Sequence, residues 1–483
     1  MSGLRGKAGA LTGAPVFGGA APLGLRTIFV TRAWELRRMK SGEAIAVRVG
    51  VIGTGHVGLI TCVSLASVGH DVVATDADSA KITRCQAGES PFYEPGVQEL
   101  LVQELASGQL TFATDAAEAI AGADVVFICV GTPPRANGEA NLVAVEHAAR
   151  TVAHCATGPV VVAEKSTVPT GTAMRLRRTL ARERPDLAAQ VDVVSNPEFL
   201  REGRALEDAL HPDRILVGAE TERAYETMRR LYEPFVAHDH ELIETDIATA
   251  ELSKHACNAF LATKISFANA LARMCERAGA DVVAVTRVMG ADPRIGSSFL
   301  GAGLGYGGSC FPKDLAAFER LASRLGYAFP LLREVARIND EAIDAAVEKI
   351  SEALWNLEDK RIALLGLSFK PGTDDVRFAP ALTLARRLTA LGASVVGYDP
   401  QVGDEVKAEA PHLEVVEHAY EAAFGAHCAV LCTEWDEFAE LDFYKLKEAM
   451  VYPVLVDGRN FFDAETLKQA GFSYYEMGRP HAG

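Results

Sequence analysis

The chain has 483 residues, of which 49% are hydrophobic and 23% charged, and its formal net charge is −16. At roughly 100–200 residues per domain, this length predicts about two to four domains that each bury a core. The acidic charge argues against nucleic acid or an anionic membrane as a partner, and no apolar stretch is long enough to predict a membrane-spanning helix.

Residues 1–45 do not match the rest of the chain. The first 38 residues are rich in Gly and Ala and carry six basic residues against one acid. Organelle transit peptides have a similar bias, but we favour an extension that is disordered or not translated, with Met39 as the initiator. We therefore expect the folded chain to begin near residue 46.

Nine cysteines are spread through the chain. An odd number without paired CxxC motifs fits a reducing cytoplasm better than a disulfide framework or a metal site. We expect a cytoplasmic protein with no bound metal. At most one cysteine should be chemically active, and the others should be small buried hydrophobic residues.

A glycine-rich turn follows the first predicted strand. The chain from residue 46 reads as a buried β-branched strand, the turn GTGHVG, an apolar helix and a second strand that ends at Asp76. Gly53, Gly55 and Gly58 permit a tight turn and the close approach of a diphosphate to the helix N-terminus. A carboxylate at Asp76 can accept hydrogen bonds from ribose hydroxyls and would repel a 2′-phosphate, which favours NAD over NADP.

Four further apolar runs, VVFICVGTP, VVVAEKSTVP, VDVVSNPEF and RILVG, alternate with helix-like segments up to about residue 240. This alternation is typical of a doubly wound parallel sheet, so we expect an N-terminal Rossmann-like α/β domain over 46–240. A second alternation begins at about 360. It predicts a smaller Rossmann-like α/β domain over 346–483, without a second glycine motif.

One long helix is predicted between the two sheets, at about 246–278, where the chain has no Pro and then reaches Gly279, a residue suited to a helix cap. This helix exceeds the usual length of globular helices, and we expect a central helical domain over 241–345. Such helices often form subunit interfaces, which predicts a homodimer or an assembly of dimers.

A glycine-rich loop leads to Cys310. Five of the eight residues 301–308 are glycines, which lets the backbone pass close to a ligand. A core cysteine does not need such surroundings, so we interpret Cys310 as a nucleophile. Lys313 is expected to lower the pKa of this thiol, and Asp314 to orient or deprotonate a water.

Other polar residues lie where a ligand could reach them. Lys254 and Asn258 share one face of the long helix and would form a donor pair for an oxyanion or alkoxide, unless this face is simply solvated. Glu198, Glu202 and Thr167 follow strand ends, where doubly wound sheets open their ligand crevice. Solvated loops are the alternative interpretation for these three.

The segment SFKPGTDDVR in the last domain places Lys370 and Arg377 directly after a strand. Two cations on an acidic protein suit a phosphate or diphosphate ligand. Salt bridges to Asp374 or Asp375 are the alternative.

Eight segments, in one order over about 49–460, carry a family resemblance: GTGHVG, VGTP, EKSTVP, SNPEFLREG, HPDRILVG, AELSKHACNAFLATKISFANA, GYGGSCFPKD and SFKPGTDDVR. Together they resemble the UDP-glucose 6-dehydrogenase family. The resemblance implies an NAD-binding domain over 46–240, a central helical domain with the Cys310 loop over 241–345 and a UDP-sugar-binding domain over 346–483.

The resemblance also implies catalytic roles. Cys310 becomes the nucleophile, and Lys254 and Asn258 become the groups that stabilise an alkoxide or oxyanion. Asp314 would assist proton transfer, with Thr167 positioning a water. Glu198 matches an acid–base carboxylate of the family.

Further residues match binding positions of the family. The implied NAD contacts are Gly53, Gly55, Val57, Gly58, Asp76, Lys81, Thr132, Thr167, Glu202, Lys313 and Arg377. The implied substrate contacts are Glu198, Phe199, Leu200, Arg201, Glu202, Lys254, Asn258, Phe299, Leu300, Gly301, Ala302, Gly303, Gly307, Lys370 and Arg459. Arg459 matches an arginine that, in some members, reaches the sugar of the neighbouring subunit.

The implied reaction is the NAD-dependent oxidation of UDP-glucose to UDP-glucuronate, which removes four electrons and reduces two NAD per sugar. Cys310 would trap the aldehyde as a thiohemiacetal, which the second oxidation converts to a thioester. Two alternatives stay open. One is a GDP-mannose 6-dehydrogenase with the same chemistry, and the other is a non-catalytic sensor of NAD or a nucleotide sugar.

Overall fold

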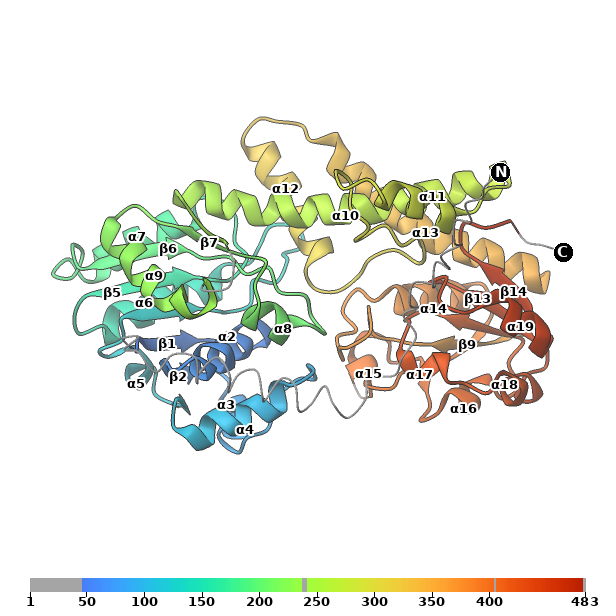
Figure 1. The fold of residues 1–483 in the computed structure, drawn as a ribbon, viewed down its shortest axis with the longest axis horizontal. Coiled ribbons are helices and arrows are strands. Elements are labelled where there is room, and N and C mark those ends of the chain that lie inside the picture. Colours follow the sequence, from blue (N-terminus) through green and yellow to red (C-terminus); the bar gives the residue numbers. More distant parts are fainter. Residues whose placement is uncertain (1–45, 237–240, 404, 481–483) are drawn as a thin grey trace, which may run out of the picture.

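The computed structural model describes residues 46–236, 241–403 and 405–480, so the extension predicted over 1–45 lies outside the described residues. The described chain contains two sheets, each covered by helices. One long helix runs along both of them (Figure 1).

The first sheet has eight strands in the order β3-β2-β1-β4-β5-β6-β7-β8. They are β1 (Arg48–Ile52), β2 (Asp71–Thr75), β3 (Leu110–Phe112), β4 (Val125–Ile128), β5 (Val160–Glu164), β6 (Val191–Ser195), β7 (Arg214–Gly218) and β8 (Glu241–Thr245). The first six strands run parallel, as predicted.

The strand RILVG (β7) departs from the predicted parallel arrangement, because it pairs antiparallel with β6. The reason is the connection, whose helix α8 (Ala205–Leu210) has only six residues. Such a helix rises about 9 Å, less than the roughly 16 Å of a strand, so it does not carry the chain back along the sheet. The chain therefore re-enters the sheet from the edge at which β6 ended.

Helices cover both faces of this sheet: α2 (His56–Ser67), α3 (Ser79–Gln86), α4 (Val97–Ser107), α5 (Ala116–Ile120), α6 (Val143–Cys155), α7 (Thr172–Glu183), α8 and α9 (Glu222–Val236). Alternate residues of β4 enter two separate cores, Val125 and Phe127 on one face and Val126 and Ile128 on the other. A strand that is buried on both faces reads as a continuous apolar run.

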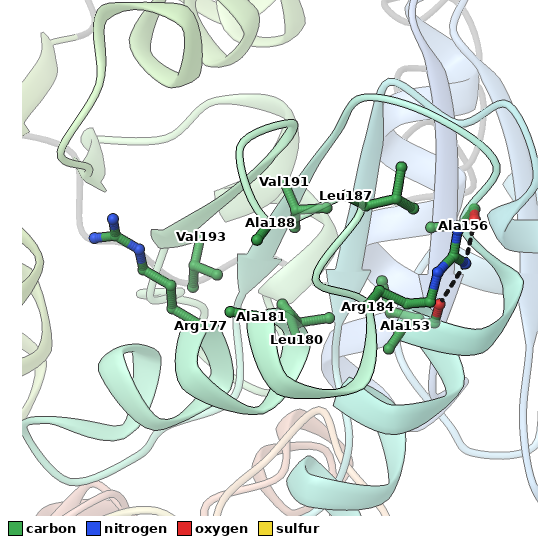
Figure 2. A pocket seen from close by; sticks show the side chains of 11 residues that line it. Ala153, Ala156, Arg177, Leu180, Ala181, Arg184, Leu187, Ala188, Val191 and Val193 are labelled. Atoms are coloured by element: carbon green, nitrogen blue, oxygen red, sulfur yellow. Dashed lines mark hydrogen bonds between the residues drawn. The ribbon is translucent and has the colours of Figure 1, made fainter.

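The end of α6 is held by a cation from the segment after α7. Figure 2 shows the small recess beside α7, where Leu180 and Leu187 supply apolar contacts. Arg184 donates through Nη1 to the carbonyl oxygens of Ala153 and Ala156, at 3.1 and 3.2 Å. These carbonyls belong to the C-terminal end of α6, where a positive charge is favourable.

The second sheet is parallel throughout, in the order β11-β10-β9-β12-β13-β14. Its strands are β9 (Arg361–Leu365), β10 (Ser394–Tyr398), β11 (Glu414–Val415), β12 (Cys428–Leu431), β13 (Val454–Asp457) and β14 (Ser473–Glu476). Its helices are α14 (Pro380–Ala390), α15 (Glu405–Glu409), α16 (Ala419–Ala423), α17 (Asp436–Ala439), α18 (Phe443–Ala449) and α19 (Ala464–Ala470). The order repeats that of the first six strands of the first sheet, which confirms the predicted second Rossmann-like fold.

The predicted long helix is confirmed as α10 (Ile247–Ala278), with 32 residues. Asp246 caps its start by accepting from the Thr249 N–H at 2.8 Å, and Gly279 ends it at a φ of 70°. The other connecting helices are α11 (Val282–Gly290), α12 (Phe311–Arg324) and α13 (Pro330–Leu354). Among the described residues, neither α10 nor any other helix is long and apolar enough to cross a membrane.

Two glycines bring the parts of the chain around the two sheets into contact. Gly203 follows β6 and Gly372 follows β9, and both have positive φ values, 79° and 83°. A Cβ atom on Gly203 would lie 2.8 Å from the carbonyl oxygen of Pro371. Nearby, the Tyr93 N–H donates to Asp374 Oδ2 at 2.9 Å.

Replacing Gly203 by alanine tests this contact, with Gly108→Ala as the control. Both positions have positive φ, so each alanine should cost about 1–2 kcal/mol. Of these two glycines, Gly203 has backbone atoms of another segment within 4 Å of the added Cβ, whereas Gly108 has no atom within that distance. We therefore expect Gly203→Ala to lower the melting temperature further, by about 2–4 °C for each additional kcal/mol. Thermal unfolding followed by circular dichroism measures both variants, and equal shifts would contradict the close contact.

Candidate active site

A cavity of about 640 Å³ lies between the two sheets and α10. Twelve of the residues singled out from the sequence line it: Glu198, Phe199, Leu200, Arg201, Glu202, Lys254, Asn258, Phe299, Gly307, Cys310, Lys370 and Arg459. They come from the loop after β6, the middle of α10, the loop before α12, and the loops after β9 and β13. The carboxyl ends of strands from both sheets thus face one cavity, as expected for doubly wound sheets.

A buried ion pair joins the loop after β6 to α10. Lys254 Nζ donates to Glu198 Oε1 at 2.9 Å. Burial opposes the charge on Lys254, but Glu198 raises the pKa of the ammonium above its usual value. Burial likewise opposes the charge on Glu198, but Lys254 and a hydrogen bond from the Leu200 N–H lower the pKa of its carboxyl. Both groups are therefore charged.

Asn258 and Asp314 form the second buried pair of the site. Asn258 Nδ2 donates to Asp314 Oδ2 at 2.6 Å, which joins α10 to the first turn of α12. Asp314 Oδ1 is buried and has no hydrogen-bond partner among the described residues. An acceptor left in this state is available to a water or a substrate hydroxyl.

Cys310 is the N-cap residue of α12 and lines the cavity. Burial, followed by the carboxylates of Glu202 and Glu198, raises the pKa of its thiol to about 12, and Lys254 opposes this shift only in part. The thiol is therefore protonated in the free protein. Six of the other eight cysteines are buried, and all nine are free thiols.

Lys254 is the cation with the largest lowering effect on the pKa of the Cys310 thiol, and the Lys313 ammonium group is bound elsewhere. Lys313 Nζ donates to Thr132 Oγ1 at 3.2 Å and lies 3.6 Å from Asp314 Oδ1. Thr132 Oγ1 in turn donates to the carbonyl oxygen of Thr167 at 3.0 Å. The structure thus brings together three of the residues implied to contact NAD, from the loops after β4 and β5 and from α12.

Glu202 lies on the side of the cavity toward the glycine turn. Burial raises the pKa of its carboxyl, and its Oε2 has no hydrogen-bond partner among the described residues. Ser309 Oγ lies 3.5 Å from Glu202 Oε1 and 3.8 Å from Cys310 Sγ. His56, the first residue of α2, lies 3.0 Å from Glu94 and is the strongest counter-charge to Glu202.

The glycine turn has the geometry that a dinucleotide requires. Gly53 has a φ of 100°, and a Cβ there would lie 2.6 Å from the carbonyl oxygen of Cys129. A Cβ on Gly58 would lie 1.8 Å from the Gly53 oxygen, whereas the space beside Gly55 is open. No side chain caps the start of α2, so its first N–H groups can meet a diphosphate. Val57 packs against the core below.

Asp76 lies one residue beyond β2, where a ribose would be expected. Its Oδ2 accepts from the N–H and the hydroxyl of Thr54, at 2.7 and 3.1 Å, and its Oδ1 accepts from the Asp78 N–H at 2.9 Å. These bonds and Lys81, at 3.8 Å, outweigh partial burial and lower the pKa of the carboxyl. An ionised Asp76 suits NAD and disfavours a 2′-phosphate.

The two predicted cations after β9 are placed differently. Lys370 lines the cavity, and burial lowers the pKa of its ammonium against the opposing effect of Glu202. Arg377 does not line the cavity. It instead forms a bidentate ion pair with Asp375, at 2.9 and 2.7 Å, which raises its pKa. The salt bridge considered as the alternative therefore forms for Arg377 but not for Lys370.

Arg459 lines the cavity of its own chain. Its Nε donates to the carbonyl oxygen of Cys432 at 2.7 Å, and its Nη1 donates to that of Gly305 at 3.2 Å. These bonds hold the side chain at the cavity of its own chain.

Four of the implied substrate contacts, Leu300, Gly301, Ala302 and Gly303, do not line the cavity. Leu300 and Ala302 are buried. The Gly303 N–H donates to Asn269 Oδ1 at 2.8 Å, and a Cβ on Gly303 would lie 2.3 Å from the carbonyl oxygen of Gly458. This segment fixes the course of the loop that carries Gly307 and Cys310.

The cavity contains residues that the sequence did not single out. Lys165 Nζ donates to Asn196 Oδ1 at 3.1 Å and to the Tyr232 hydroxyl at 3.3 Å, and all three line the cavity. The Arg214 guanidinium stacks 3.9 Å from the centre of the Phe199 ring. Lys165 lies next to a strand end in EKSTVP, and that position could have drawn attention to it. Tyr232 belongs to α9 and had no such signal.

Comparison with known protein families covers most of the chain. Three models of the UDP-glucose/GDP-mannose dehydrogenase family match in order. They are the NAD binding domain at residues 47–236, the central domain at 248–341 and the UDP binding domain at 363–464. Together with the open glycine turn and the ionised Asp76, the first match identifies NAD as the cofactor.

Individual relatives agree with these matches. The chain is 43% identical to a UDP-glucose 6-dehydrogenase of Bacillus subtilis, over 90% of this chain and 98% of the relative. It is 44% identical to one of Rhizobium meliloti, over 90% of this chain and all of the relative. A UDP-glucose dehydrogenase structure from Pyrobaculum islandicum superposes with a TM-score of 0.83 at 38% identity, covering 90% of this chain and 98% of that one. The chain therefore belongs to the UDP-glucose/GDP-mannose dehydrogenase family.

Proposed function

We propose that the chain oxidises UDP-glucose to UDP-glucuronate and reduces two NAD per sugar. The observation that carries the proposal is the position of Cys310, at one cavity wall with the charged Lys254–Glu198 pair and next to Asp314. The curated relatives are named as UDP-glucose 6-dehydrogenases and supply the substrate class. A binding protein would need a pocket and cations but no thiol.

Three parts of the chain have different roles in this reaction. Residues 46–240 bind NAD on the glycine turn, 241–345 supply α10 and the Cys310 loop, and 346–483 hold the UDP-sugar. Lys370 and Arg459 are the cations of the last part that reach the cavity, and they suit the diphosphate of the nucleotide sugar.

In the first oxidation, the sugar C6 hydroxyl must lose a proton and a hydride. NAD, when bound, supplies the hydride acceptor for each of the two oxidations. Lys254 can donate a hydrogen bond to the C6 oxygen as negative charge develops there, because its ammonium stays charged beside Glu198. Asn258 lies one helical turn further along α10 and can offer its amide to the same oxygen.

The second oxidation needs the aldehyde to be held. The Cys310 sulfur adds to C6, and the thiol proton passes to the carbonyl oxygen, which gives a thiohemiacetal. Loss of a second hydride and of the hydroxyl proton leaves a thioester. A water bound at Asp314 Oδ1, with Thr167 nearby, then attacks C6. One proton of this water passes to the departing sulfur and the other to Asp314, which releases the carboxylate and the thiol.

We propose that two copies of the chain associate through α10. Phe260, Phe267 and Met274 repeat at seven-residue intervals along this helix and are 65%, 52% and 65% exposed. Val288 on α11 is 73% exposed. A row of large apolar residues at heptad spacing is typical of a helix that packs against a partner, and a second copy offers the same row.

We also propose a cytoplasmic location. All nine cysteines are free thiols, and six of them are buried in the cores of the sheets and helices. Free thiols in this number are typical of a reducing compartment.

The stoichiometry of the reaction tests the proposed function. Purified protein with UDP-glucose and excess NAD should form two NADH per sugar, measured at 340 nm with the acid quantified by chromatography. Cys310→Ser should lower the rate of acid formation by about a thousandfold or more, because the aldehyde is no longer trapped as a sulfur adduct. Cys257→Ser is the control, since this thiol also lines the cavity.

The outcomes distinguish the alternatives. Turnover of GDP-mannose without turnover of UDP-glucose would replace the proposed substrate. Absence of turnover with any nucleotide sugar, despite binding of NAD, would support the sensor. Unchanged acid formation in Cys310→Ser would remove the thiol from its role.

The reactivity of the Cys310 thiol can be tested by alkylation. The pKa of the Cys310 thiol is about 12 in the free protein. At any pH well below this value, the fraction present as thiolate increases about tenfold with each unit by which the pH rises. Alkylation of Cys310 by iodoacetamide, followed by peptide mass spectrometry, should therefore accelerate from pH 7 to pH 9 without a plateau. Lys254→Met should slow the reaction at each pH, because Lys254 lowers the pKa of the thiol. A plateau near pH 8 would contradict the raised pKa.

Charged substitutions on α10 test the proposed assembly. Phe260→Glu with Phe267→Glu should convert the dimer to monomers in light scattering after size-exclusion chromatography, since charges would enter an apolar contact. Phe424→Glu is the matched control, because this residue is 73% exposed but lies far from α10 in the chain, in the last domain. An unchanged dimer in the double variant would place the interface elsewhere.

A further inference from the structure

A second cavity, of about 470 Å³, lies outside the site described above. It is lined by the loops after β4 and β5, the first two turns of α6, most of the length of α7 and the C-terminal half of α12. It shares no lining residue with the cavity that contains Cys310.

This cavity is strongly cationic in an acidic protein. Six arginines line it, against two glutamates: Arg135, Arg150, Arg175, Arg182, Arg320 and Arg324, with Glu139 and Glu146. Arg150 is paired with Glu146, at 3.0 Å, and Arg182 with Glu183.

Within the part of the chain that the structure describes, the other four arginines have no carboxylate partner. No carboxylate of the described residues lies within 4.0 Å of Arg135, Arg175, Arg320 or Arg324. Arg320 and Arg324 are four residues apart on α12 and so share a face. Surface arginines of this protein are mostly paired, and four unpaired guanidinium groups at one cavity favour an anion there.

Other groups at the cavity also lack partners. The Thr170 hydroxyl oxygen is buried, has no hydrogen-bond partner among the described residues and belongs to a residue that lines the cavity. The first turn of α6 faces the cavity. In this turn, only the Val143 N–H donates to a side chain of the described residues, that of Asn141. Helix N-termini favour negative charge, so these groups add to the arginines.

We propose that this cavity binds a compact phosphorylated anion with two or more phosphate groups. Two or more phosphates match four free guanidinium groups, each of which can bind phosphate oxygens in a bidentate manner. The volume is large enough for a triphosphate, and apolar side chains such as Leu142 and Leu176 could contact an attached ring.

The position connects this ligand to the catalytic region. Arg135 follows Thr132 by three residues, and Thr170 follows Thr167 by three, so two lining segments continue from the cluster around Lys313. Arg320 and Arg324 lie on α12, whose first turn contains Lys313 and Asp314. A bound anion therefore ties together the segments that hold the NAD end of the site.

Isothermal titration calorimetry of the full-length protein with tripolyphosphate tests the proposal. UDP and NADH are kept at saturating concentrations so that the first cavity and the glycine turn are blocked. We expect one site per chain, with Arg175→Ala and Arg320→Ala each weakening binding by about tenfold or more and the double variant abolishing it. Arg178 lies on α7, as Arg175 does, but does not line the cavity, so the Arg178→Ala variant should bind tripolyphosphate like the parent protein.

Further arms identify the ligand chemistry. Orthophosphate at equal ionic strength should bind much more weakly than pyrophosphate and tripolyphosphate, because it can engage fewer guanidinium groups. Tighter binding of ATP than of tripolyphosphate would show that a nucleoside occupies the apolar wall. Absence of a UDP-resistant site, or equal binding by the double variant, would overturn the proposal. Melting curves of the variants without ligand confirm that they are folded.

Discussion

The buried ion pair between Lys254 and Glu198 is the interaction on which the site depends. It fixes α10 to the carboxyl edge of the first sheet at 2.9 Å and keeps both groups charged in a place from which water is largely removed. Two charges are costly to bury, and breaking such a pair leaves an unpaired charge inside the protein. The pair therefore sets the distance between the loop after β6 and the helix that faces Cys310.

The two sheets share one strand order over six strands, but the carboxylates that follow their second strands differ in burial and in hydrogen bonding. Asp76 after β2 accepts hydrogen bonds mainly from Thr54 and stays partly exposed. Asp399 after β10 is buried, and one of its oxygens accepts from two backbone N–H groups, the Ser368 hydroxyl and the Trp435 indole. That carboxylate is saturated by its own domain, which explains why one sheet, and not both, presents a dinucleotide site.

The catalytic and cationic regions meet along α12. Its first residues touch the cavity with Cys310, while Lys313 binds the hydroxyl of Thr132 and Asp314 binds Asn258. Its last turns present Arg320 and Arg324 to a separate cavity. One helix thus contacts α10 and the loops of the first sheet with its first turn, and lines the second cavity with its last turns.

The sequence by itself determined the two Rossmann-like folds, the bounds of α10 and the positions of the glycine turn, because hydrophobic period, caps and positive-φ glycines act over a few neighbouring residues. Local motifs and the family resemblance also identified twelve of the residues that line the cavity. Only the tertiary structure decided the antiparallel entry of β7, the direction of the Lys313 side chain and the raised pKa of Cys310. These depend on burial and on charges from distant segments, which no local pattern records.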